Sequence, residues 1–281
     1  MAHHTGRPAR TPRRRRAGSA GLAALAAGVL LAGPLAACGD DDDAATSGAE
    51  GGQASDTTAD AAPVIDPGDG GDYQPSLDPA QVVPVIDNPY LPFTPGSRWV
   101  YEGTDDGEEE HIEVVVTDQR RRVMGIDAVV VRDIVSTGGE VIEDTYDWYV
   151  QDTTGNVWYL GEETAEYEDG EVVSTEGSWE AGVDGALPGI VMQAQPEVGQ
   201  AYRQEFYEGE AEDLAEVARL GEQETVAGTA YDQVAVIEEW NPLEPEVVEE
   251  KYYAPGVGTI LEVKTAGGEG RIELVEYTPA P

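Results

Sequence analysis

The residues that most often carry enzyme chemistry are scarce in this chain of 281 residues. After position 38 there is a single histidine, His111, and no cysteine. Zinc sites built from Cys and His and cysteine nucleophiles are therefore excluded there. A Ser-His-Asp arrangement would need His111, which lies in an acidic run, and no Gly-x-Ser-x-Gly motif is present. We expect His111 to be an exposed histidine at the edge of a strand.

Carboxylates are abundant instead, with 56 Asp and Glu residues. Glycoside hydrolysis needs two carboxyl groups about 5 to 10 Å apart in a cleft. Among so many acidic residues the sequence cannot single out a catalytic pair. A carboxylate-dependent hydrolase acting on glycans stays an alternative, and no catalytic residue is assigned.

Two acidic segments have features of calcium sites. Residues 152–163 place Asp, Thr, Asn and Glu at the first, third, fifth and twelfth positions of an EF-hand loop, but Val157 replaces the glycine at position six. A β-hairpin is the favoured interpretation of this segment. A looser surface site at Asp105, Asp106 and Glu108 stays open. Because no glycine-rich phosphate loop or dinucleotide motif occurs either, no metal ligand and no cofactor is assigned.

Cys38 is the only cysteine and follows Leu35, Ala36 and Ala37. This pattern resembles the bacterial lipobox, whose cysteine receives a diacylglyceryl group before the signal peptide is cleaved. The other interpretation is a secretory signal with an unrelated cysteine near its cleavage site. We predict lipidation of Cys38, because two acyl chains hold a protein on a membrane durably.

Residues 1–37 have the composition of a cleaved signal peptide. Six arginines and no acidic residue lie in positions 1–16, and residues 20–35 are almost entirely Ala, Leu, Gly and Val. This apolar run is shorter than the roughly 20 residues of a membrane-spanning helix, and Pro34 interrupts it. The sequence leaves open whether export follows the general or the twin-arginine route.

Residues 38–80 are predicted to form the lipidated cysteine and a disordered acidic tether. They begin with the acidic run 40–43 and continue mostly with small and polar residues, which bury too little apolar surface to offset the entropy of ordering. A flexible chain of this length spans on the order of 35 Å.

The charge of the chain restricts its partners. Six of the 16 basic residues precede Cys38 and all 56 acidic residues follow it, so the chain from Cys38 onward has a formal net charge of −46. Such a polyanion repels nucleic acid and anionic lipid head groups. We therefore expect no nucleic-acid partner, and attachment to the extracytoplasmic face of the cell membrane through the lipid on Cys38 alone.

Residues 81–281 are predicted to form one β-rich domain. Short alternating runs rich in Val, Ile, Tyr and Trp recur about every ten residues, with turn residues between them. The expected strands are 97–102, 112–117, 128–135, 141–150, 157–160, 200–207, 233–239, 247–253, 259–264 and 271–277. Only 210–220 fits a helix and a strand equally well. We predict a strongly curved antiparallel sheet or partly open barrel with at most one or two short helices, and a two-sheet sandwich as the alternative.

Three segments carry a resemblance to a known family. Residues 88–101 (NPYLPFTPGSRWVY), 155–159 (GNVWY) and 251–258 (KYYAPGVG) are similar to an uncharacterised family of exported bacterial lipoproteins. Over barely a dozen residues, the last segment also resembles a hairpin found in periplasmic half-barrel proteins that carry lipoproteins. The resemblance implies a fold and a location, and it brings no catalytic residues.

Aromatic side chains occupy both faces of the expected strands, since neighbours such as Trp158 and Tyr159 point to opposite sides. Ordinary core packing accounts for most of them. We hypothesise that a second set of aromatic rings lines an apolar or sugar-stacking groove. Our main functional hypothesis is therefore a non-enzymatic binding module for an apolar ligand, a lipid or an envelope protein. A structural or assembly lipoprotein that works through its surface is a further alternative.

Overall fold

The computed structural model describes residues 73–281. The predicted signal peptide, Cys38 and most of the predicted tether lie outside the described residues. The elements are η1 (Pro79–Gln81), β1 (Val82–Val83), β2 (Arg98–Asp105), β3 (Glu108–Val123), β4 (Ile126–Thr137), β5 (Glu140–Asp152), β6 (Val157–Glu168), β7 (Glu171–Ser174), β8 (Trp179–Glu180), β9 (Leu187–Met192), β10 (Ala201–Arg203), β11 (Glu205–Phe206), β12 (Leu214–Val226), β13 (Thr229–Trp240), β14 (Val248–Ala254), β15 (Gly258–Ala266) and β16 (Gly270–Thr278).

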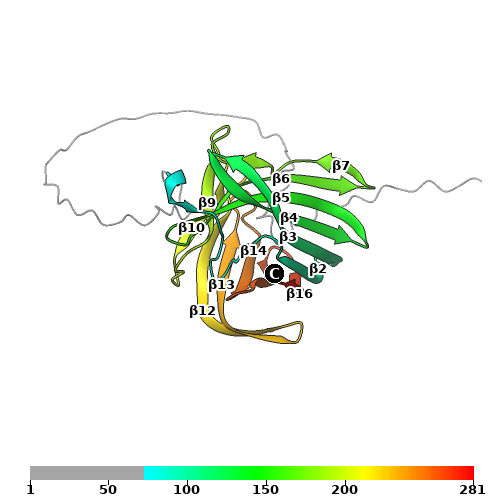
Figure 1. Cartoon of the computed structure of the whole chain (residues 1–281). Helices are drawn as coiled ribbons and strands as arrows, with labels where there is room; N and C mark the ends of the chain where they lie inside the picture. Colours follow the sequence, from blue (N-terminus) through cyan, green and yellow to red (C-terminus); the bar gives the residue numbers. More distant parts are fainter. Residues whose placement is uncertain (1–72) are drawn as a thin grey trace, which may run out of the picture.

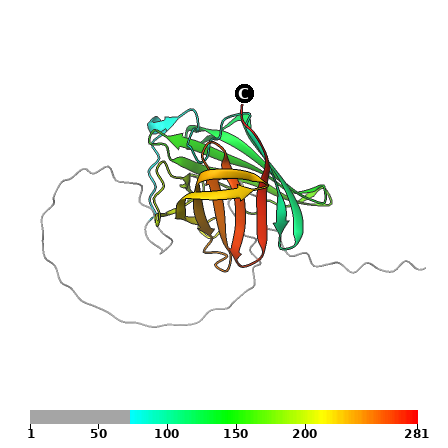
Figure 2. The ribbon, with the colours of Figure 1, turned by 90° about the horizontal axis from the view of Figure 1, so that it is seen from below.

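The strands form one antiparallel sheet that curves into a nearly closed barrel (Figures 1 and 2). Its order is β10-β12-β13-β14-β15-β16-β2-β3-β4-β5-β6-β9-β11, while β1, β7 and β8 pair with β5 or β6 beside this path. The two end strands, β10 and β11, are separated along the chain only by Gln204. A single short segment therefore pairs with β12 at one end and with β9 at the other, and it brings the two edges of the sheet together.

Tight turns connect the long hairpins. The β2–β3 turn at Asp106-Gly107 and the β12–β13 turn at Ala227-Gly228 each have positive φ at both positions. Two successive positive φ angles are typical of type I′ turns, whose twist matches that of the flanking strands. In Figure 1 the β12–β13 hairpin extends past the ends of its neighbours.

The predicted mainly β class and curved sheet are confirmed, and the two-sheet sandwich is not formed. Each of the ten expected strands coincides with an observed strand or, for 200–207, with β10 and β11. The ambiguous stretch 210–220 contains the start of β12, because β10 and β13 supply hydrogen-bonding partners on both of its sides. Strand β9 was not predicted. Its sequence contains Pro188 and Gly189, residues that rarely occur inside strands.

Contacts with the sheet begin before residue 81. The Tyr73 side chain is buried, its hydroxyl donates a 2.8 Å hydrogen bond to the Pro188 carbonyl, and its ring packs on Phe206 with centroids 5.8 Å apart. The packed part of the chain therefore includes Tyr73, which belongs to the segment predicted as tether. An aromatic ring with a satisfied hydroxyl buries enough surface to order the residues around it.

The aromatic rings of the interior pack against one another, as most of them were expected to do. Tyr149 stacks on Tyr159 with centroids 4.8 Å apart, and Trp99 stacks on Tyr277 at 5.2 Å. Phe93 bridges these groups through an edge contact with Trp99 and a tilted contact with Tyr149. The rings therefore fill one part of the barrel interior as a core.

Candidate functional site

A second part of the barrel interior is polar. In β5, alternation places Asp147 on the same face as the core residue Tyr149, and the cross-strand partner of Asp147 is Glu162 in β6. Both carboxyl groups are buried. Charged residues are almost never fully buried unless they are paired. We therefore expect each of these two carboxyl groups to have a hydrogen-bond or charge partner.

Asp147 and Glu162 share one tyrosine hydroxyl. The Tyr159 hydroxyl lies 2.7 Å from Asp147 Oδ1 and 2.9 Å from Glu162 Oε2. A hydroxyl has one proton to donate, so one of the two carboxyl groups must be protonated and donate to the tyrosine oxygen. Burial raises the pKa of both carboxyl groups, and their mutual repulsion raises that of Glu162 further. The pair therefore retains a proton at neutral pH.

Glu205 and Asp213 form a second carboxyl pair at the place where the barrel closes. They are hydrogen-bonded to each other, and burial raises the pKa of both groups. Trp179 Nε1 donates a 2.8 Å hydrogen bond to Glu205 Oε2. Because a bond between two carboxyl groups needs a proton, this pair also carries at least one.

The only two lysines of the chain, Lys251 and Lys264, are both buried in this interior. Lys251 Nζ lies 2.7 Å from Glu239 Oε2 and 3.8 Å from Glu262 Oε2. Burial lowers the pKa of Lys251, but the neighbouring carboxylates outweigh this effect and leave it well above its usual value. Lys251 is therefore charged, and it offsets part of the negative charge that the sheet encloses.

Lys264 neutralises another part of the interior. Its Nζ lies 2.6 Å from Asp105 Oδ1 in β2. Glu110 in β3 is also buried, and burial, together with the charges of Asp105 and Glu143, raises its pKa to about 7. Carboxyl groups thus outnumber ammonium groups throughout the interior, and protonation relieves the excess charge.

A small cavity lies inside the barrel. One cavity of about 40 Å³ lies among residues of β2, β3, β5, β9, β14 and β15, with Trp99, Tyr149 and Tyr253 in its wall. Ligand pockets usually measure roughly 300–1,000 Å³. This cavity is therefore too small for a lipid-sized apolar ligand.

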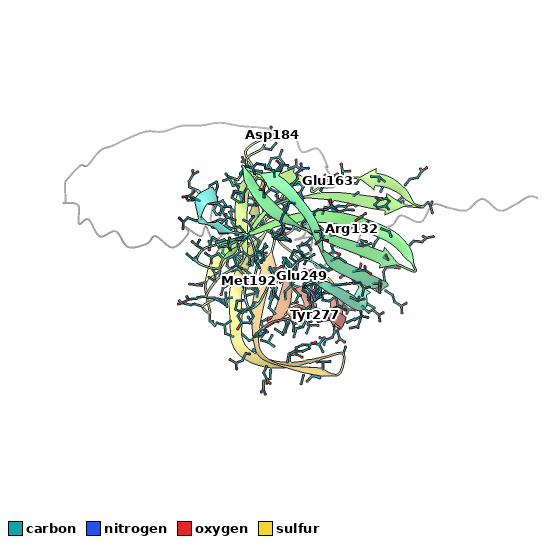
Figure 3. The ribbon with its side chains drawn as sticks, viewed as in Figure 1. Arg132, Glu163, Asp184, Met192, Glu249 and Tyr277 are labelled. Atoms are coloured by element: carbon teal, nitrogen blue, oxygen red, sulfur yellow. The ribbon has the colours of Figure 1, made fainter. Side chains whose placement is uncertain are left out.

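A larger cleft of about 290 Å³ is lined by residues of β3, β5 and β6, by β8, which pairs with β6, and by the 181–186 loop. Its buried wall includes Trp148, Trp179 and Glu162, and its exposed residues include Glu163 and Asp184. Figure 3 shows Glu163 and Asp184 at the same end of the molecule. The cleft is therefore lined by two tryptophans, with exposed carboxylates beside it.

The cleft contains an ion pair stacked on an aromatic ring. The Arg121 guanidinium carbon lies 4.6 Å from the centre of the Trp148 ring, and Arg121 Nη2 lies 2.7 Å from Glu180 Oε2. Tyr207, which follows β11, lines the same cleft. This arrangement satisfies the cationic side chain with one carboxylate and one π face.

His111, Asp152 and Asp105, which the sequence singled out, do not line the cleft. His111 is exposed in β3, as expected, with Nδ1 3.8 Å from Glu102 Oε1. The Asp152 carboxylate accepts bonds from the backbone of the β5–β6 turn and from Trp158 Nε1, so this segment is the hairpin we favoured. The surface group at 105–108 does not stand free, because Asp105 is paired with Lys264.

Among residues 73–281 no cluster of three or more His, Cys, Asp or Glu side chains has the geometry of a metal site. No helix in that range has the length and apolar character needed to cross a bilayer.

Comparisons with known proteins return a distant likeness in fold. Neither protein-family models nor curated protein sequences give a match. One similar solved structure is a protein from Bacteroides fragilis, described as exported and as having a YmcC-like fold, with 14% identity and a TM-score of 0.40 over 68% of this chain and 99% of that one. Another is a protein from Parabacteroides distasonis described as a lipoprotein, with 12% identity and a TM-score of 0.37 over 67% and 98%. These values are too low to carry an argument about function.

The sequence did not predict Glu162, Asp147 and Lys251 as a group. Alternation gives no signal for Asp147, because the apolar residues Tyr146, Trp148 and Val150 lie on the opposite face of β5. The bulge that brings Glu162 opposite Asp147 cannot be read from the sequence.

Proposed function

We propose that this protein is a lipid-anchored, extracytoplasmic, non-enzymatic binding module that holds a small ligand, or one group of a larger partner, in the cleft between β5, β6 and β8. The observation that carries the proposal is the cleft of about 290 Å³ with Trp148, Trp179 and Glu162 in its wall. Concave sites with aromatic walls and a few converging polar groups are typical of ligand pockets. This cleft is larger than the cavity of about 40 Å³ inside the barrel, which directs the proposal to it.

The predicted lipid anchor supports a function at the cell membrane. We expect the mature protein to begin at Cys38 and to carry a diacylglyceryl group on its thiol, because the motif ends there and the chain has no other cysteine. Mass spectrometry of the protein extracted from membranes measures both features, and Cys38→Ser should release the protein from the membrane fraction. A mature chain that begins at another residue, or that begins at Cys38 without a lipid, would contradict this assignment.

Binding can be tested with the full chain carrying Cys38→Ser. Amide NMR spectra are recorded with three probes of different chemistry: choline, N-acetylglucosamine and palmitate. We expect at least one polar probe to shift the signals of Trp148, Trp179 and their neighbours. Palmitate binding with shifts confined to the barrel interior, or no shift at the cleft with any probe, would contradict a binding site in the cleft.

A carboxylate-dependent hydrolase is the second candidate. It is favoured by the Asp147–Glu162 pair, which is close, buried and partly protonated, as a general acid must be. Only Glu162 of this pair lines the cleft, which favours binding over hydrolysis. Release of reducing sugar from cell-wall glycans that is lost in Glu162→Gln would establish the hydrolase. No release by the unmodified chain would exclude it for these substrates.

A further inference from the structure

Lys264 in β15 and Asp105 in β2 meet although their strands are not neighbours in the sheet. Strand β16 lies between β15 and β2. Lys264 Nζ lies 2.6 Å from Asp105 Oδ1, and the two side chains are only 6% and 8% exposed. An amine and a carboxyl group are therefore held in contact across a strand and largely shielded from water.

Glycine makes this approach possible. Gly270 in β16 is the sheet partner of Asp105, and a Cβ at position 270 would lie 2.6 Å from Asp105 Oδ1 and 3.2 Å from Lys264 Cβ. A Cβ at Gly268 would lie 3.0 Å from Lys264 Cδ. A larger residue at either position would push the pair apart. The backbone of residues 268–270 thus packs directly against the two side chains.

Glu110 in β3 adds a second carboxyl group to this place. Its sheet partner Gly103 lies two residues before Asp105, so Glu110 and Asp105 project from the same face of the sheet. The Glu110 residue is 7% exposed, and burial and the charge of Asp105 raise its pKa to about 7. Glu110 can therefore release and take up a proton near neutral pH.

The buried ion pair is less favourable in this position than a neutral group would be. Two buried charges lose their hydration, whereas an amide carries no charge. Groups that a fold holds in contact also react as if each were present at about 10⁵ M or more. Asp106 Oδ2 lies farther from Lys264 Nζ, at 3.7 Å, and its side chain is 64% exposed. Asp105 is therefore the partner for which condensation is favoured.

We propose that Lys264 and Asp105 condense into an amide bond once the chain has folded, with Glu110 as the group that moves the protons. Nζ first passes a proton to Asp105 Oδ1 across the 2.6 Å contact, and the neutral amine attacks Asp105 Cγ. Glu110 gives a proton to the departing hydroxyl group and takes one from the nitrogen. One C–N bond forms, one C–O bond breaks, and one water molecule leaves.

The initial proton transfer is needed because Lys264 is charged before the reaction. Burial lowers the pKa of Lys264, but the hydrogen bond to Asp105 and the neighbouring carboxylates outweigh this effect and leave it above its usual value. Only the neutral amine has a lone pair that can attack a carboxyl carbon.

The bond would join two residues that are 159 positions apart in the chain. It would enclose β3 to β14 in a covalent ring, and such a ring restricts the unfolded chain as a disulfide does. The bond would stand whether or not the cleft binds a ligand.

Tryptic peptide mapping of the full chain by mass spectrometry tests the bond. The Lys and Arg residues of the sequence delimit peptides 99–120, which contains Asp105, and 252–264, which ends at Lys264. Trypsin does not cut after an amidated lysine. We therefore expect 99–120 joined to 252–271, lighter than the two separate peptides by one water molecule.

Variants test the assignment of each group. Lys264→Arg keeps the positive charge and lacks the reactive amine, so peptide 99–120 should be released unlinked. The matched control Lys251→Arg changes the other lysine of the chain and should still give the linked peptide. In timed samples from cell-free synthesis, Glu110→Gln should form the link at least about tenfold more slowly than the unmodified chain.

Complete cleavage after Lys264 in the unmodified chain would overturn the bond. A water molecule lost within peptide 99–120, with Lys264 still cut, would indicate a cyclic imide at Asp106-Gly107 and would overturn it too. Because the unmodified chain gives this first result, a variant that fails to fold cannot hide it.

Two further outcomes concern the named residues. A link that persists in Lys264→Arg, or one that is lost in Lys251→Arg alone, would overturn the assignment to Lys264. Equal rates for Glu110→Gln and the unmodified chain would overturn the role of Glu110.

Discussion

At the scale of single residues, the barrel interior contains charged side chains, and their ion-pair partners neutralise only part of that charge. Lys251 is the clearest case, because it is one of two lysines in a strongly acidic chain and lies between Glu239 and Glu262. Glu239 is held by further donors: the Gln204 amide donates to Oε1 at 3.0 Å and the Tyr253 hydroxyl at 3.3 Å. Lys251 thus completes a group of ion pairs and hydrogen bonds that links β13, β14, β15 and the barrel closure.

We expect Lys251→Met to lower the free energy of unfolding by about 3–5 kcal/mol, because it leaves buried carboxylates without their cation. Urea unfolding at neutral pH measures this change. The double variant Lys251→Met/Glu239→Gln should recover part of the loss. As a comparison, Arg122→Ala removes the exposed pair with Asp127 and should cost less than about 1 kcal/mol. Equal losses for Lys251→Met and Arg122→Ala would refute the role assigned to Lys251.

At the scale of elements, the closure of the barrel depends on a close backbone approach between β9 and the segment that contains β10 and β11. Gly189 in β9 lies against Gln204, and a Cβ at position 189 would come within 2.0 Å of the Gln204 carbonyl oxygen. The glycine that obscured β9 in the sequence is thus needed for the fold. A strand can carry a glycine where another backbone must come this close.

We expect Gly189→Ala to separate β9 from β11 and to lower the thermal midpoint of unfolding clearly, with faster hydrogen exchange at residues 201–206. The control is Gly228→Ala in the β12–β13 turn, where φ is +83° and a Cβ meets no other atom. That variant should cost only the strain of positive φ, on the order of 1 kcal/mol. Unchanged exchange at residues 201–206 in Gly189→Ala would show that this approach does not hold the barrel closed.

At the scale of the whole molecule, the buried carboxyl groups make stability depend on pH. Glu110 has a pKa of about 7 in the folded chain and 4.5 as its reference value. The groups that influence it are Asp105, Glu143, Glu249 and Lys264. Between these two pH values the folded state holds a proton that the unfolded state has released, so stability falls as pH rises. The Asp147–Glu162 and Glu205–Asp213 pairs act in the same direction.

We therefore expect the free energy of unfolding to be greater near pH 5 than at pH 7.5. Denaturant unfolding across this range measures it, and Glu110→Gln should flatten the slope between about pH 4.5 and 7. The control variant Glu113→Gln removes a carboxylate whose pKa the hydrogen bond from Arg98 lowers, so it should leave that slope unchanged. A stability that rises steadily from pH 5 to 7.5 would contradict the protonated interior.

The sequence by itself determined the β class, the ten main strands and the curved antiparallel sheet, because alternation and turn residues are local signals. The prediction that Cys38 is lipidated also rests on the sequence alone. Only the tertiary structure decided that buried carboxyl groups share the interior with the aromatic core, that Glu162 lies beside Asp147, and that the cleft joins Trp148 to Trp179. These facts depend on register, on one β-bulge and on the closure at Gln204, which bring together residues far apart in the chain. Such long-range contacts leave no mark in the local pattern of residues, so the sequence could not predict the candidate site.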